Sequence, residues 1–202
     1  MIEPTTNSTD SVQLQVETLT QIAKKLTSEG KEAQALEAYK TASGLMLGAP
    51  WLQHRTAELA RKLRQPEVAA LHYRRAAAAF IRAGFPKRAL SPLRSAWQAS
   101  VPLLPGNASA FITVSLELAN VQRELGFAAD AKLTLTNTNL ALEASGSPER
   151  APTARELEQA KPISKSKPPA PAGSEPPDSG VVSSVQSSSS SLLSRLEGAV
   201  KP

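Results

Sequence analysis

Two histidines and one serine–lysine pair are the side chains in this 202-residue sequence that could take part in catalysis. His54 and His72 lack a nearby cluster of Asp or Glu at metal-ligand spacing, so we interpret both as ordinary residues of the surface or of a groove edge. Ser28 and Lys31 have the spacing of serine–lysine hydrolases, but Gly30 places them across a helix end and no accompanying motif is present. None of these residues predicts a catalytic site.

The sequence also lacks the residues that typically bind cofactors or metal ions. The sequence contains no cysteine, which excludes disulfides, zinc–thiolate sites and thiol nucleophiles. Its ten glycines form no Gly-rich loop that could hold a phosphate. Residues 1–11 are polar, and no stretch approaches the ~20 apolar residues of a membrane span. We therefore expect a cytoplasmic, non-catalytic protein without cofactor, metal, membrane contact or small-molecule substrate.

Charge is the feature that points most directly to a partner. Residues 55–94 contain ten lysines and arginines against two glutamates, a local net charge of +8, whereas the whole chain carries +5 and the remainder therefore −3. Such asymmetry favours an acidic partner through steering and charge-assisted hydrogen bonds. Two other interpretations stay open: a solvated cationic face, and a surface for nucleic acid, for which interleaved aromatic residues and a reading helix are missing.

The elements that must position these charges are helices, because alanine and leucine are abundant and aromatic residues make up only 4% of the chain. Breaks at residue 30, residues 48–50, before Pro66, and at residues 84–85, 101–107 and 126–127 divide residues 11–145 into about seven helices. Residues 111–118 alternate like a strand, but the length of their segment favours a helix. Pro92 is expected to bend or shorten the helix that contains it.

The two ends of the chain differ in composition from this helical region. Residues 1–10 are expected to form a flexible N-terminus. Eight of the 16 prolines lie between Pro148 and Pro177, and serine dominates after Gly180, so we predict that residues 146–202 form a disordered tail. Within the tail, residues 191–200 make a short amphipathic segment that is either a docking helix or an unstructured end.

A repeat organises the helical region. Ala35, Tyr39 and Ala42 recur 34 residues later as Ala69, Tyr73 and Ala76, and each triplet falls at i, i+4, i+7 on one helix face. A helix pair that cannot bury such a face alone must stack on its neighbour, which predicts a solenoid of antiparallel helix pairs. With Gly30 before the first triplet, these residues resemble the tetratricopeptide repeat family over about residues 15–143.

The sequence departs from that family in its spacing. Arg64 stands where a turn glycine is usual, and the next echo of the triplet, at Ala89, follows Ala69 by only 20 residues. The fourth helix is therefore expected to belong to two successive pairs. Ala131 then follows Ala89 by 42 residues, so a more irregular type of helical-hairpin solenoid also stays open.

The resemblance implies a concave groove lined by the first helix of each pair. The residues that it places there are Lys24, His54, Glu58, Arg61, Arg74, Asn120 and Arg123. The charge count adds Arg82, which we expect to share a basic face with Arg61 and Arg74. The predicted function is a non-catalytic scaffold or adaptor that binds an acidic protein segment through this groove and basic face. The alternative is an RNA-binding helical domain that uses residues 55–94.

Overall fold

The computed structural model describes residues 7–159, and every regular element in this part of the chain is helical. The elements are α1 (Asn7–Ser28), α2 (Glu32–Leu45), α3 (Pro50–Lys62), α4 (Pro66–Arg82), α5 (Pro86–Ser100), the short 3-10 helix η1 (Val101–Leu103), α6 (Ala108–Glu124), α7 (Ala128–Ala144) and α8 (Ala154–Gln159). The predicted all-α fold is confirmed. The helices α1 to α7 belong to one structural unit, which ends at Leu157.

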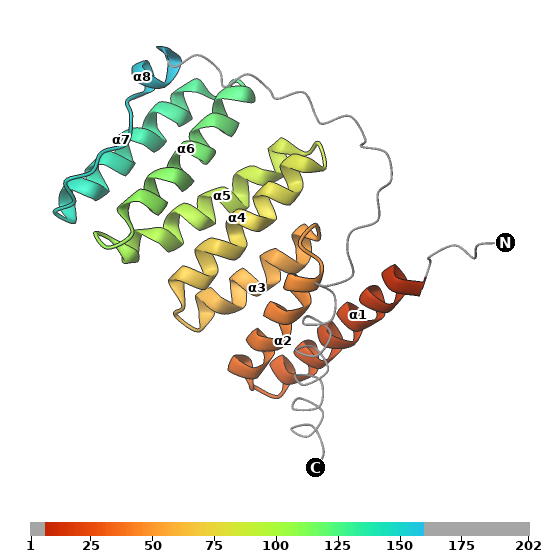
Figure 1. Cartoon of the computed structure of the whole chain (residues 1–202). Coiled ribbons are helices and arrows are strands. Elements are labelled where there is room, and N and C mark those ends of the chain that lie inside the picture. Colours follow the sequence, from red (N-terminus) through yellow and green to blue (C-terminus); the bar gives the residue numbers. More distant parts are fainter. Residues whose placement is uncertain (1–6, 160–202) are drawn as a thin grey trace, which may run out of the picture. The chain divides into compact units, whose positions relative to one another are not determined.

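The helices are stacked in the order of the sequence (Figure 1). Each of α1 to α7 packs mainly against the helix before it and the helix after it. The fourth helix packs against both α3 and α5, as the short 20-residue step predicts. On its α5 side, Ala77 lies in one buried cluster with Ala89 and Leu93 of α5 and with Leu118 and Val121 of α6.

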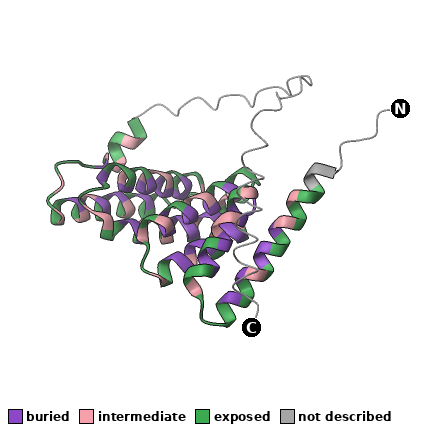
Figure 2. Ribbon diagram, turned by 60° about the horizontal axis from the view of Figure 1, so that its bottom comes forward, coloured by how far each residue is buried: buried purple, intermediate pink, exposed green. Residues whose placement is uncertain are grey.

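The repeated small residues are buried where the helices meet. The alanines of both triplets and of the echo that begins at Ala89 are all 0% exposed: Ala35, Ala42, Ala69, Ala76, Ala89 and Ala96. The residues between them, Tyr39, Tyr73 and Leu93, are also buried. Figure 2 shows the buried residues along helix faces that point to other helices, with exposed residues on the outer faces. The predicted stripes are therefore the surfaces through which the helices stack.

Five helices in the described residues end in the same turn, which fixes the angle at which each next segment starts. The second residue after each of these helices has a left-handed backbone, with φ of 74° at Gly30, 55° at Arg64, 81° at Gly84, 85° at Gly126 and 73° at Gly146. Its N–H bonds to the carbonyl three residues earlier, and the next N–H bonds to the carbonyl five residues earlier. This is the Schellman arrangement, and it satisfies carbonyls that have no partner inside the helix.

Replacing Arg64 by glycine should raise the free energy of unfolding by roughly 0.5–1 kcal/mol. A left-handed conformation costs a residue with a Cβ atom ~1–2 kcal/mol, and the larger unfolded-state entropy of glycine offsets part of that gain. Urea unfolding measures the change, and Gly84→Ala at the equivalent turn should shift stability in the opposite direction. A neutral or destabilising Arg64→Gly variant would show that the arginine side chain makes a compensating contact.

Prolines start three of the helices, and a further proline lies inside one of them. Pro50, Pro66 and Pro86 occupy the first turns of α3, α4 and α5, where a missing N–H costs no hydrogen bond. Pro92 lies buried inside α5, yet the helix is not shortened and runs to Ser100. The proline removes one hydrogen bond near the helix start, while the packing of α5 on α4 and α6 holds the rest.

The helical region is longer than predicted at both ends. The first helix begins at Asn7, inside the segment that composition assigns to a flexible terminus. After α7, residues 148–157 pack back on α6 and α7, where Ala151 is 0% exposed, so the boundary expected at residue 145 is too early. The prolines and charged residues of this segment suggest disorder. However, its contacts with α7 include hydrogen bonds of its backbone, which amino-acid composition cannot predict. The remainder of the predicted tail, with its segment at 191–200, lies outside the described residues.

Candidate functional site

A basic groove lies between α1 and α3, the first helices of two successive pairs. Its volume is about 560 Å³, and its lining combines charged and hydroxyl groups with Tyr39 and Leu59. The polar lining residues are Lys24, Thr27 and Ser28 from α1, with Arg55, Glu58, Arg61 and Lys62 from α3. We call this the α1–α3 groove. Three of the predicted partner-binding residues, Lys24, Glu58 and Arg61, meet in it.

Two of the cations at this groove are already paired with acids. Arg55 bonds to Glu58 at 2.9 Å, and this hydrogen bond raises the pKa of Arg55. Lys62 is ion-paired with Glu32 of α2. Within residues 7–159, no carboxylate lies at salt-bridge distance from Lys24 or Arg61, which are both exposed. The groove therefore keeps two cations that can bind an external acidic group.

His54, another of the predicted residues, does not line the groove but lies next to Glu58, which does. Its ring packs edge-on against Tyr73 of α4, with the ring centres 5.4 Å apart, and its Nδ1 lies 3.7 Å from Oε1 of Glu58. Burial raises the pKa of the Tyr73 hydroxyl, and the nearby guanidinium of Arg61 opposes that rise. The aromatic contact holds the imidazole of His54 in place beside the groove.

A second groove lies along α4, where its lining includes Glu117 of α6 and Leu93 of α5, and it contains Arg74 and Arg82. Its volume is about 480 Å³. Arg74 is half-buried and bonds to Glu117 through two nitrogens, Nε at 2.9 Å and Nη2, which raises its pKa. Its charge is therefore neutralised within the fold. Arg82 is exposed, and its Nε donates to the carbonyl of Ala78 at 3.4 Å. The predicted basic face is thus divided between two grooves.

The last two predicted residues lie on α6, away from both grooves. Asn120 is exposed and lines neither of them. Arg123 donates from Nη1 to the carbonyl oxygen of Leu157 at 3.1 Å, so it holds the segment that follows α7. These two residues do not join the other predicted residues in one site.

The surface position expected for His72 is wrong. His72 is only 4% exposed, and its Nδ1 lies 2.8 Å from Oε1 of Gln53 on α3. The amide nitrogen of Gln53 donates to the carbonyl of Ser43 on α2 at 2.8 Å, so its oxygen must accept the proton from Nδ1 of His72. Desolvation by burial, with the charges of Arg75 and Lys40, lowers the pKa of His72 to about 4. His72 is therefore a neutral residue, and Gln53 links it on α4 to α3 and α2.

Several lining residues of the α1–α3 groove were not predicted. Thr27, Ser28 and Tyr39 carry no signal for binding, because a hydroxyl near a helix end and a tyrosine in a buried stripe are typical of structural positions. Arg55 and Lys62 belong to the basic run, and a helical wheel of α3 that placed Glu58 and Arg61 together could have included them.

Two further findings concern the described residues as a whole. No group of three or more His, Cys, Asp or Glu side chains between residues 7 and 159 is placed to hold a metal ion. Within the same residues, no helix combines the length and apolar character needed to cross a membrane.

Comparisons with known proteins identify no family. No protein-family model matches the sequence, and a comparison with curated proteins finds no match. Among solved structures, the chain is similar to the crystal structure of BtubC (BKLC) from P. vanneervenii at 16% sequence identity and a TM-score of 0.35, over 70% of this chain and 68% of that chain. A likeness at this level supports no conclusion about fold or function.

Proposed function

We propose that this protein is a non-catalytic scaffold of the tetratricopeptide-like type, which binds an acidic segment of another protein in the α1–α3 groove. The observation that carries the proposal is the position of Lys24 and Arg61 on the two sides of one groove, exposed and without an acidic partner in the described residues. The recurring helix turn and the buried alanine stripes support the tetratricopeptide-like class.

The groove offers an acidic segment two kinds of contact. Its cations attract the partner over distance and make charge-assisted hydrogen bonds with carboxylates at contact. The side chains of Leu59 and Tyr39 add apolar surface to the lining, so a segment that mixes acidic and apolar residues fits better than a purely acidic one. We expect the charges to set orientation and on-rate, and the apolar contacts to contribute the remaining affinity.

A direct test compares two fluorescein-labelled probes by anisotropy: a short peptide of mixed glutamate and leucine, and a single-stranded RNA oligonucleotide of matched charge. The proposal requires the peptide to bind more tightly at physiological salt. If the RNA binds more tightly, with an affinity that falls log-linearly with salt, residues 55–94 are instead a nucleic-acid surface and the proposal fails.

Reversing both groove cations should weaken peptide binding. In Lys24→Glu with Arg61→Glu, repulsion replaces attraction, and we expect an affinity loss of at least about tenfold, or ~1.4 kcal/mol. The matched control is Lys87→Glu with Arg88→Glu on α5, which makes the same charge change among exposed residues outside the groove. Circular dichroism should show the same helix content in both, because exposed charge changes cost little stability. Equal losses in the two variants would mean that only overall charge matters.

A further inference from the structure

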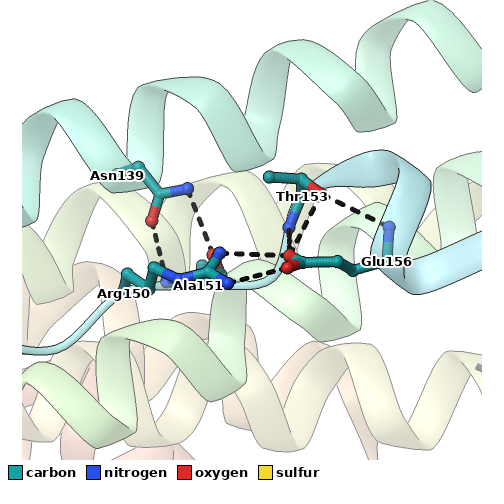
Figure 3. A network of polar contacts seen from close by, with 5 residues as sticks. All are labelled: Asn139, Arg150, Ala151, Thr153 and Glu156. Carbon is teal, nitrogen blue, oxygen red and sulfur yellow. Dashed lines mark hydrogen bonds and ion pairs between the residues drawn. The ribbon is translucent and has the colours of Figure 1, made fainter.

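The segment after α7 binds the outer side of the last helix pair in the way that a peptide binds a receptor. We call residues 148–157 the strap. Asn139 of α7 holds its backbone with both ends of one amide (Figure 3): Nδ2 donates to the carbonyl oxygen of Ala151 at 3.1 Å, and the N–H of Ala151 donates to Oδ1 at 2.7 Å. These two bonds use only main-chain groups of the strap, so they do not depend on covalent continuity with α7.

Side chains of the strap fill an apolar surface on α6 and α7. Ala151 is 0% exposed and packs in one cluster with Ala119, Ala131 and Leu135. Further along the strap, Ala154 and Leu157 pack against the same cluster, together with the partly buried residues Ile112 and Leu116 of α6. Arg123 of α6 then binds the carbonyl of Leu157 at 3.1 Å. This apolar surface of α6 and α7 therefore accepts a small residue at the position of Ala151 and a leucine at the position of Leu157.

The strap also carries bonds that shape it independently of the surface. Arg150 makes two bonds with Glu156, at 2.7 and 3.0 Å (Figure 3). The N–H of Glu156 donates to Oγ1 of Thr153 at 3.3 Å, and the N–H of Thr153 donates to Oε2 of Glu156 at 2.7 Å. These two reciprocal bonds form a capping box at the start of α8. Since all of these partners lie within the strap, a free peptide of the same sequence can form them too.

We propose that this face of α6 and α7 is a second recognition site, separate from the α1–α3 groove, and that the strap occupies it as a built-in competitor. The ligand from another protein would share the chemistry of the strap: an extended start with a small residue whose backbone meets Asn139, then a capped helical turn that presents a leucine. Larger residues at the position of Ala151 are excluded, because that side chain is fully buried.

Competition by the strap determines how the site behaves. A segment on a short linker has an effective concentration on the order of millimolar, so an external peptide must exceed this value or the strap must be displaced. The apparent affinity of the intact chain for a peptide is reduced by the fraction of molecules with an open site.

The test uses the full-length chain, labelled with ¹⁵N, and a synthetic peptide of residues 148–159. Ala151→Arg should expel the strap, because arginine cannot occupy a site filled by a methyl group, and Glu149→Arg is the control at an exposed strap position. The backbone amide signals of Ala131 and Leu135, which belong to the covered cluster and remain in every variant, report peptide binding, and the exchange rate of the backbone amide at position 151 reports strap release. We expect the Ala151→Arg chain to bind the peptide at least tenfold more tightly than the parent or the Glu149→Arg chain. Adding Asn139→Ala to Ala151→Arg should abolish this binding.

Three results would overturn the proposal. A strap that stays protected from exchange in Ala151→Arg would show that the small-residue position is not selective. A released strap without peptide binding would show that the face holds only a covalently attached cap. A concentration-dependent dimer of the parent chain that exchanges straps, detected by light scattering, would assign the site to a second copy of this chain instead of a different protein.

Discussion

Acidification from neutral pH to pH 4 should lower the free energy of unfolding by about 3 kcal/mol through His72 alone. The pKa of His72 is lowered to about 4 in the folded protein, while an unfolded histidine has a pKa near 6.5. Between these values the unfolded chain binds a proton that the folded chain does not. The stabilising contribution is therefore fully present above about pH 6.5 and is lost as the pH falls towards 4.

The contacts of His72 give this prediction its control. Its Nδ1–H donates to Gln53, and Arg75 and Lys40 are the positive groups that disfavour a second proton on the ring. Asparagine can place an amide donor near the position of Nδ1 but does not titrate, so His72→Asn should remove most of the pH dependence. Urea unfolding of both proteins at several pH values measures the difference. Equal pH dependence in the two proteins would show that His72 does not titrate as this environment requires.

Enlarging a buried alanine of the stripe should destabilise the protein by ~1–3 kcal/mol. Ala35 and Ala69 are 0% exposed at positions where neighbouring helices cross, and a leucine there must push the helices apart or adopt a strained rotamer. We expect Ala35→Leu and Ala69→Leu each to lower the urea midpoint without changing the helix content of the folded state.

Each variant has an exposed alanine on its own helix as a control. Ala33→Leu on α2 and Ala78→Leu on α4 make the same chemical change on exposed positions and should alter stability by no more than about 0.5 kcal/mol. If the buried and exposed variants lose equal stability, the effect comes from the residue type and not from the helix crossing.

The fold could be predicted because the residues that pack between the helices are close together in the sequence and recur at the spacing of a helix face. Ala35, Tyr39 and Ala42 lie on one face by helix geometry alone, and burial of that face follows from its residue types. The left-handed turns at Gly30 and Gly84 are local as well, since each needs only a glycine after a helix. The 34- and 20-residue steps between triplets also indicated correctly that α4 packs on two sides.

The site could be predicted only in part, because an ion pair between residues far apart in the sequence produces no recognisable sequence pattern. Lys24 and Arg61 meet in a groove because their helices belong to successive pairs, which the resemblance implied. Arg74 looked like a free cation, yet its partner Glu117 lies 43 residues further along the chain. A triple reversal of Arg61, Arg74 and Arg82 would therefore mix lost binding with lost stability, and the Lys24 and Arg61 pair is the cleaner test.

His72 and the strap show the same limit. Histidine is a residue type typical of exposed or functional positions, and only the amide of Gln53 on another helix makes its burial tolerable. Residues 148–157 have the composition of a linker, and their polar attachment to the helices uses two side chains, Asn139 and Arg123, that no periodicity identifies.

Packing between consecutive helices also has a kinetic consequence. Because α1 to α7 make their contacts mainly with the next helix along the chain, the contact order is low, and no large loop must close before native contacts form. Folding can nucleate at any adjacent pair of helices and spread in both directions, so stability becomes a sum of nearest-neighbour terms. Opening is then expected to start at α1, which among the described helices packs mainly on α2, whereas the strap covers α7 and α4 in the middle keeps both of its interfaces to the last.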